Sequence, residues 1–311
     1  AVMALASQVT SKIKLATGVT IPSNRISAVT ASAFGTLNHI APGRIIFGVG
    51  TGFTGRRTMG MNAIKLKDME DYVNEVYGLL AGDIIETTFE GQKRKIRLLN
   101  PEAGLINTKD PVQLHMSAMG PKARKTCARM NAGWVNFIAD TGAANADLQE
   151  MQSEWSAAGN SGDLYSTAFT LGRVLDDGEP YDSDKAMAQA GPLCAVAFHN
   201  YVEMEERGSL FPMAPEMAET VAKYKELYDK YEPADARYLN LHAGHLIYLR
   251  DDERPLITAD HIKGITFTGT VSQIRDKIAA VRDGGHDQLA IQIVEDHEDA
   301  IEDWAEVIKG M

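Results

Sequence analysis

The feature that most constrains this chain is the regular alternation of short apolar runs with longer segments whose apolar residues recur at helical spacing. Ile45, Ile46 and Phe47, for example, form an apolar run typical of a strand that is covered on both faces. Such alternation predicts an α/β fold around a parallel sheet, either doubly wound or closed into a barrel. Six core strands are expected, at 13–19, 44–50, 112–118, 134–139, 165–175 and 288–294.

Amphipathic helices are expected between these strands, and two regions interrupt the pattern. The first region, 83–110, is expected to form a hairpin or an irregular excursion. The second, 208–268, combines a helical segment with an irregular stretch that contains His242 and His245. Both regions are interpreted as insertions in a single domain that covers 1–311. The expected helices are 28–40, 66–80, 121–131, 144–158, 184–206, 217–231, 269–282 and 299–309.

Charge and cysteine content exclude several classes of function. The chain has 31 Lys and Arg against 42 Asp and Glu, a net charge of −11, which argues against non-specific binding to nucleic acid or to an anionic membrane. An anionic ligand must therefore be held by a local basic site. The two cysteines, Cys127 and Cys194, lack metal-ligand spacing and indicate neither a disulfide framework nor a zinc site. No apolar run is long enough to span a membrane, so a cytoplasmic location is expected.

A glycine-rich loop with two arginines follows the strand at 44–50. Its glycines could let the backbone approach a ligand closely, and its N–H groups beside Arg56 and Arg57 could hold a phosphate or carboxylate. Glycine-rich turns also occur after strands for structural reasons alone. The loop by itself therefore leaves both interpretations open. Its four glycines are Gly48, Gly50, Gly52 and Gly55.

Three stretches together resemble the bacterial-luciferase-like flavin oxidoreductases, whose fold is a (β/α)8 TIM barrel. They are Leu15-Ala-Thr-Gly-Val-Thr-Ile-Pro-Ser-Asn-Arg25, Ala41-Pro-Gly-Arg-Ile-Ile-Phe-Gly-Val-Gly-Thr-Gly52 with Arg57-Thr-Met-Gly60, and His115-Met-Ser-Ala-Met-Gly-Pro-Lys-Ala123. Their order and spacing are similar to the third, fourth and fifth strand regions of that family. The segment from Thr270 to the last strand is similar to its eighth unit.

The resemblance implies that a complete barrel has two βα units ahead of the strand at 13–19. The expectation is therefore that the first two βα units are absent from 1–311, and that this is not the complete translated protein or that a second polypeptide completes the barrel. A sheet that lacks these units would leave backbone donors and acceptors unpaired at its edges.

The resemblance also implies where a flavin would bind, at the C-terminal ends of the strands. Its phosphate is expected at an arginine of the glycine-rich loop and at the turn before the helix 121–131, whose N-terminus favours an anion. In many relatives the peptide that matches Gly18-Val19 is a non-prolyl cis bond. The cofactor-binding candidates are Thr17, Gly18, Val19, Gly50, Thr51, Gly52, Arg56, Arg57, Ser117, Gly120, Pro121 and Lys122.

Histidines are the candidate catalytic residues. Histidine side chains can titrate near neutrality, which makes His242 and His245 candidates, and Gly244 between them lets the backbone come close to a ligand. His115 becomes a third candidate if it points into the barrel. A hydrogen-bonded structural role is the alternative for each. No metal site is expected, because neither a carboxylate nor a third histidine shares the segment of His242 and His245.

Two catalytic functions and one non-catalytic function follow from the resemblance. In the first, which the resemblance favours because FMN is the more frequent cofactor of the family, FMN reduced by a separate flavin reductase reacts with oxygen in a monooxygenase that acts on a small organic substrate. In the second, a deazaflavin exchanges hydride with the substrate, as in a reductase or dehydrogenase. In the third, the chain is a non-catalytic partner subunit or flavin-binding protein. A homodimer or higher oligomer is expected in each case.

Overall fold

The computed structural model describes residues 1–206 and 217–311. These form two compact units, the first made of Ala1–Arg57, Met61–Val135 and Glu150–Tyr165, the second of Thr58–Gly60, Asn136–Gln149 and Ser166–Met311. Among the described helices, none combines the length and apolar character that crossing a membrane requires.

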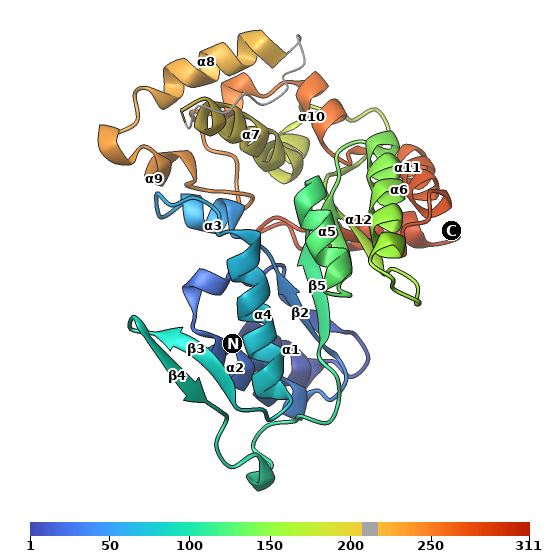
Figure 1. Ribbon diagram of the computed structural model, residues 1–311. Coiled ribbons are helices and arrows are strands. Elements are labelled where there is room, and N and C mark those ends of the chain that lie inside the picture. Colours follow the sequence, from blue (N-terminus) through green and yellow to red (C-terminus); the bar gives the residue numbers. More distant parts are fainter. Residues whose placement is uncertain (207–216) are drawn as a thin grey trace. The chain divides into compact units, whose positions relative to one another are not determined.

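The first unit is built on parallel strands with helices between them (Figure 1). Its strands are β1 (Leu15–Ala16), β2 (Ile45–Val49), β5 (Gln113–Ser117) and the start of β6 (Gly133–Phe137). Its helices are α1 (Val2–Val9), α2 (Ser27–Ile40), α3 (Phe53–Arg57), α4 (Leu66–Leu80) and α5 (Pro121–Arg129). Helices α2 and α4 pack against each other on one side of the strands.

The two faces of this sheet have different neighbours. Phe47 of β2 lies 4.8 Å, between ring centroids, from Phe34 of α2, so its side of the sheet faces the helices. Because side chains alternate along a strand, Gly48 lies on the opposite face. The register pairs Gly48 with His115, and His115 with Gly133. His115 therefore points to the face away from α2, as does Ser117 two residues later.

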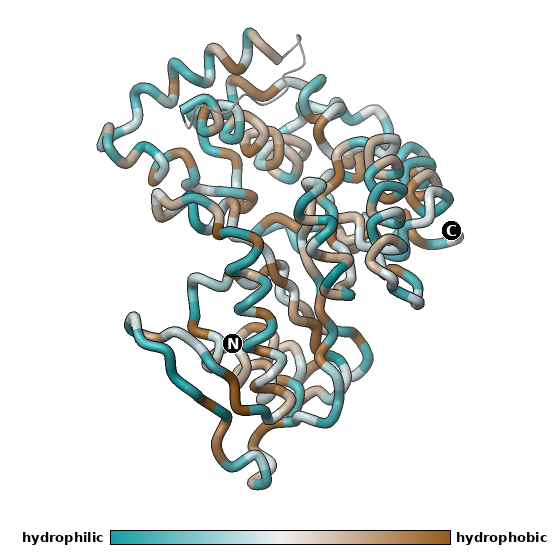
Figure 2. Tube along the Cα trace, in the orientation of Figure 1, coloured by the Kyte–Doolittle hydropathy of each residue, from teal (hydrophilic) through white to brown (hydrophobic). Residues whose placement is uncertain are grey.

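The region 83–110 contains the hairpin that the sequence predicts. Strands β3 (Ile85–Phe89) and β4 (Gln92–Ile96) pair antiparallel, and Glu90 and Gly91 form the turn with positive φ angles of 52° and 72°. Positive φ at both central positions is typical of the tight turns that match the twist of a hairpin. The tube in Figure 2 is hydrophilic along β4, whose residues are mostly exposed.

The second unit contains the remaining strands and most of the C-terminal helices. Strand β7 (Ser166–Leu171) pairs parallel with β10 (Gln288–Gln292), and β8 (Val174–Leu175) with β9 (Gly269–Thr270). After the end of β6, the Ile138 N–H donates to the Phe169 carbonyl at 2.8 Å. The strand order of the main sheet is β1-β2-β5-β6-β7-β10. The helices are α6 (Thr141–Ala157, which continues into the first unit), α7 (Asp184–Glu206), α8 (Ala218–Tyr228), α9 (Tyr238–Leu241), α10 (Ala259–Ile265), α11 (Val271–Asp283) and α12 (Ala300–Ile308).

The predicted α/β fold is confirmed, and the six strands of the main sheet lie at the six expected core strands, with β6 beginning one residue before the expected 134–139. Among the α-helices and strands of the described residues, four short ones were not predicted: α3 inside the glycine-rich loop, α9 in the stretch expected to be irregular, α10, and β9 before α11. Helix α10 begins at a capping box in which Thr258 and His261 exchange side-chain and backbone hydrogen bonds. It lies in the expected insertion 208–268, of which 208–216 lie outside the described residues.

Candidate cofactor site

The glycines after β2 make room for the protein's own chain. A Cβ on Gly48 would lie 1.8 Å from the carbonyl oxygen of Thr17, and one on Gly55 would lie 2.4 Å from Cδ1 of Ile21. Gly52 has a φ of 79°, and its Cβ would lie 2.5 Å from Cγ2 of Ile21. Each of these three glycines therefore has a packing requirement, because the segment after β1 occupies the space that a Cβ would need. Their approach to a ligand stays a prediction.

Thr17 fastens the end of β1 to β2. Its hydroxyl donates to the Gly48 carbonyl at 2.8 Å and accepts from the Gly48 N–H at 3.0 Å and from the Thr20 hydroxyl at 3.0 Å. A hydroxyl has one donor and two acceptor lone pairs, so all three are engaged. The hydroxyl therefore holds the two strand ends together, and a contact of Thr17 with the cofactor stays a prediction.

The two arginines of the loop have different surroundings. Arg57 is 4% exposed, and its guanidinium carbon lies 3.4 Å from the centroid of the Phe53 ring. This stacking fits the weakly hydrated guanidinium. Arg56 donates to the carbonyl of Asn62 and contacts the sulfur of Met61 at 3.7 Å. Arg57 is thus the arginine that turns inward, and Arg56 fixes the path of the following loop. A phosphate contact by either arginine stays a prediction.

The ends of β1, β2 and β5 converge in the first unit. The Gly18–Val19 peptide bond is cis, which confirms that expectation. A Cβ on Gly50 would lie 2.9 Å from Cγ2 of Val19 and 3.6 Å from Cβ of Ser117. Val19, Gly50 and Ser117 therefore lie together at the strand ends, as the sequence predicts. The backbone of the neighbouring Thr51 accepts from the Ile64 N–H at 3.0 Å.

The turn between β5 and α5 has open space beside Gly120 and a positive electrostatic potential. Gly120 is the N-cap of α5, with φ −88° and ψ 161°, and a Cβ there would meet no atom within 4 Å. The same holds at Gly18. Helix α5 begins with Pro121 and Lys122, and its first turn has no acidic residue to offset the helix dipole. Within the described residues, the Ser117 hydroxyl and the Lys122 ammonium form no hydrogen bond or ion pair.

His115 lies deeper than this turn on the same face of β5. Its ring packs beside Gly133, whose Cβ would lie 2.8 Å from it, and 5.4 Å from the Tyr165 ring centroid. Burial lowers the pKa of His115, with a smaller contribution from Lys14. The ring is therefore neutral at neutral pH, and its proposed catalytic role stays a prediction.

In the second unit, His242 and His245 lie beside a third histidine, which the sequence analysis did not associate with them. His199 comes from α7, and one ring nitrogen of each of the three residues lies within 4.8 Å of the others. His199 pairs with Glu253 at 2.6 Å and His242 with Glu203 at 3.0 Å. The sequence feature that could have indicated this cluster is the four-residue spacing of His199 and Glu203, which places both side chains on one face of α7.

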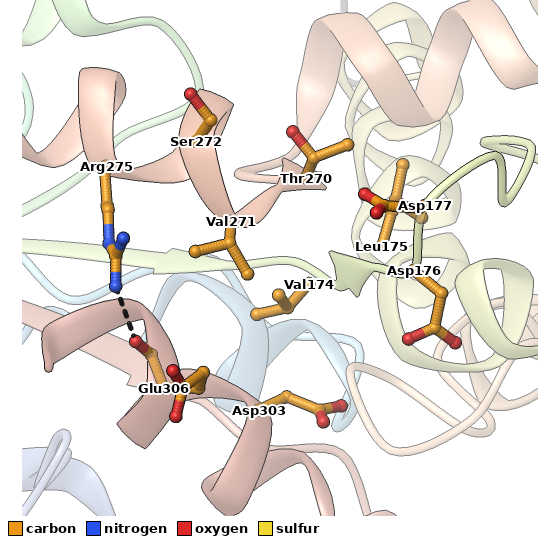
Figure 3. A pocket seen from close by; sticks show the side chains of 10 residues that line it. All are labelled: Val174, Leu175, Asp176, Asp177, Thr270, Val271, Ser272, Arg275, Asp303 and Glu306. Atoms are coloured by element: carbon orange, nitrogen blue, oxygen red, sulfur yellow. Dashed lines mark hydrogen bonds between the residues drawn. The ribbon is translucent and has the colours of Figure 1, made fainter.

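The second unit also has a surface pocket of about 610 Å³ between the β8–β9 pair and helices α11 and α12 (Figure 3). Four of its lining side chains are acidic, which disfavours a phosphate. Its arginine, Arg275, donates to the carbonyls of Glu306 and Val307 at 2.9 Å and so caps the end of α12. None of the predicted site residues lines it. The lining residues are Val174, Leu175, Asp176, Asp177, Thr270, Val271, Ser272, Arg275, Asp303 and Glu306.

Sequence comparison relates the chain to coenzyme-dependent oxidoreductases. It is 33% identical over 126 residues to 5,10-methylenetetrahydromethanopterin reductase of Methanolobus tindarius, a match that covers 40% of this chain and 37% of the relative. The same enzyme of Methanopyrus kandleri is 28% identical over 240 residues, or 71% of this chain and 67% of the relative. The F420-dependent glucose-6-phosphate dehydrogenase of Nakamurella multipartita is 32% identical over 133 residues, or 40% and 38%. The first relative is thus spanned over little more than a third of its length.

Solved structures share the fold at low sequence identity. The coenzyme F420-dependent tetrahydromethanopterin reductase of Methanopyrus kandleri aligns with a TM-score of 0.64 at 21% identity, over 97% of this chain and 84% of that one. The oxygenating constituent of 3,6-diketocamphane monooxygenase from Pseudomonas putida, in complex with FMN, aligns with a TM-score of 0.59 at 13% identity, over 98% and 80%. The family model described as luciferase-like monooxygenase matches residues 1–288. The chain belongs to the luciferase-like monooxygenase family.

Proposed function

We propose that the chain is an oxidoreductase that binds a deazaflavin of the coenzyme F420 type at the ends of β1, β2 and β5, and transfers hydride to or from a small organic substrate. The observation that carries this proposal is the turn at Gly120 and Lys122, which has open space and combines the positive end of a helix dipole with a lysine. Two relatives support the choice of cofactor. The glucose-6-phosphate dehydrogenase of Nakamurella multipartita is named as F420-dependent, and so is the tetrahydromethanopterin reductase of Methanopyrus kandleri, which shares the fold.

The residues at this turn fit a phosphate group. The N-terminus of α5 presents the N–H groups of Gly120 and Lys122 and the positive end of the helix dipole, and an anion satisfies both. Lys122 adds a positive charge where a helix would otherwise favour an acidic residue. The Ser117 hydroxyl is free to donate from the end of β5. The absence of a Cβ at Gly120 leaves space for the phosphate oxygens next to the backbone.

The neighbouring strand ends would hold the ring system of the cofactor. Gly18 faces open space, and Val19 and Gly50 form an apolar surface beside Ser117. Packing an aromatic ring against such a surface excludes water from the reacting face. When bound, the deazaflavin supplies a two-electron hydride carrier. The chain's own residues then bind the phosphate, orient the ring and keep the site dry.

FMN is the second candidate, with the chain acting as a monooxygenase that needs a separate flavin reductase. It is favoured by the fold shared with the FMN-bound diketocamphane monooxygenase. The same phosphate turn serves either cofactor, because both carry a phosphate. A non-catalytic partner subunit would need no open phosphate turn. Cytoplasmic location, oligomeric state and completion of the barrel by a second polypeptide stay predictions.

Titration of the chain with coenzyme F420 and with FMN, followed by difference absorbance, tests the proposal. We expect saturable binding of F420, and about tenfold weaker binding after Lys122→Ala or Ser117→Ala, because each removes one hydrogen bond to a charged group. Lys125→Ala is the matched control, since Lys125 lies on the same helix and pairs with Glu154 at 3.8 Å. Equal losses in Lys122→Ala and Lys125→Ala would refute a local phosphate site.

A second experiment separates the two cofactors. The cofactor-loaded chain is reduced without oxygen, mixed with candidate substrates, and then exposed to a pulse of oxygen. Hydride transfer by F420 predicts turnover that needs no oxygen and is unchanged by the pulse. Oxygen uptake matched by oxygenated product would instead support the FMN monooxygenase. Failure to bind either cofactor would contradict both and favour the partner-subunit function.

A further inference from the structure

Three histidine rings face one another inside the second unit. His199 lies on α7, while His242 and His245 follow α9. The ring centroids are 5.7 Å apart for His199 and His242, 5.7 Å for His242 and His245, and 6.3 Å for His199 and His245. The three rings thus form a nearly regular triangle that joins two segments far apart in the sequence.

Each ring has a buried Nδ1 atom without a hydrogen-bond partner in the described part of the chain. At the other edge of two rings, a carboxylate binds Nε2: Glu253 that of His199, and Glu203 that of His242. A carboxylate accepts the N–H of a neutral imidazole, so Nδ1 of these two rings is left as a bare lone pair. Buried acceptors without donors are costly and rare, and here three occur together.

The surroundings favour a positive charge between the rings. Glu203 and Glu253 are each 2% exposed, and Arg250 pairs with Glu253 at 3.1 Å. These three groups sum to one net negative charge. Tyr224 also donates to Glu253 and fixes its orientation.

We propose that His199, His242 and His245 bind a divalent transition metal ion of the Zn²⁺ class through their Nδ1 atoms. A tetrahedral ion with Zn–N bonds of about 2.0–2.1 Å places its nitrogens roughly 3.4 Å apart. One ring nitrogen of each histidine lies within 4.8 Å of the others, so side-chain rotations can bring three nitrogens to this spacing. Glu253 and Glu203 then act as the outer partners that orient metal-bound histidines. Three protein ligands leave a fourth position for water or another ligand.

The sequence indicated no metal site because His242 and His245 lack a third ligand in their own segment. The fold supplies it from α7. The metal would link α7 to the segment after α9. The proposal therefore gives His242 and His245 the role of metal ligands in place of acid–base catalysis. This inference is independent of the cofactor proposed above.

Metal binding by the full chain is the direct test. The chain is treated with a chelator, dialysed, and titrated with Zn²⁺ in competition with a chromogenic chelator, and with Co²⁺ followed by visible absorbance. We expect one ion per chain, the absorption of a tetrahedral Co²⁺ centre, and a higher melting temperature with Zn²⁺. Binding should weaken about 100-fold or more in His245→Ala and be unchanged in His39→Ala, which removes an exposed histidine of α2.

Glu203→Gln keeps all three ligands and a side chain of the same size, so it tests the arrangement even if His245→Ala does not fold. We expect it to weaken Zn²⁺ binding by about 10- to 100-fold, the usual effect of removing an outer partner. Wild-type affinity in folded His245→Ala or in folded Glu203→Gln would overturn the proposal. So would the absence of one-to-one binding by the wild-type chain.

Discussion

Replacing Gly48 with alanine should separate β1 from β2. The added Cβ would lie 1.8 Å from the carbonyl oxygen of Thr17 and 3.0 Å from its carbonyl carbon. Both are backbone atoms, so no side-chain rotation relieves the overlap. The strands must move apart by more than about 1 Å to restore an ordinary contact distance near 3.5 Å.

The expected loss of stability has two parts. Overpacking in a dense core costs about 1–3 kcal/mol. Moving the strands also disturbs the hydrogen bonds between Gly48 and the Thr17 hydroxyl, and the bond from the Thr20 N–H to the Gly48 carbonyl at 2.7 Å. At about 1 kcal/mol for each of these bonds, the total is roughly 4–6 kcal/mol. That is comparable with the entire stability of many domains.

Hydrogen exchange of the β2 and β5 amides, followed by mass spectrometry, measures this loss within the first unit. Gly48→Ala should expose these amides far more often than the wild type does. Gly162→Ala is the control, because a Cβ at Gly162 meets no atom within 4 Å. If Gly48→Ala protected β2 to within about 1 kcal/mol of the wild type, the packing role given to this glycine would be wrong.

Three further predictions concern the cofactor turn, acid stability and the second unit. Gly120→Val should leave the melting temperature nearly unchanged but reduce F420 binding at least about tenfold in the absorbance titration, since its side chain enters open space at the turn; unchanged binding would contradict the site. Burial lowers the pKa of His115 and His286 below the ordinary 6.5, so unfolding takes up protons and stability falls as the pH drops through about 6.5. The urea midpoint should therefore decrease between about pH 7.5 and 5.5, and a constant midpoint would argue against this. Asp287 accepts from the N–H and hydroxyl of Ser166 at 2.8 and 2.9 Å, so Asp287→Ala should cost about 2–3 kcal/mol in urea unfolding, whereas a cost below about 0.5 kcal/mol would refute a stabilising role.

The strands and long helices could be predicted because their signal is local. The apolar run at Ile45 and the helical spacing over 184–206 are visible in the sequence, and β2 and α7 form there. Elements such as β9, with only two residues, have too little sequence to show a period. Helix α3 could not be predicted because it is short and Gly55 in its middle has low helix propensity.

The candidate site was predictable in position but not in detail. The strand-end residues Gly50 and Ser117 lie together because β2 and β5 are parallel neighbours, so their C-terminal ends lie at the same edge of the sheet. Which arginine turns inward depends on Phe53, and the role of Gly48 depends on Thr17, which is distant in sequence. The histidine cluster depends on the packing of α7 against a segment whose own sequence gives no sign of a third ligand.

Hydrogen exchange of the whole chain with and without saturating coenzyme F420 tests the proposed cofactor site most directly. Amides that bind a phosphate become protected, whereas Pro121 has no amide hydrogen and reports nothing. The proposal predicts new protection at the turn around Gly120 and Lys122 and at the end of β1 around Val19. Protection confined to the second unit, or no change at the turn under saturating F420, would contradict it.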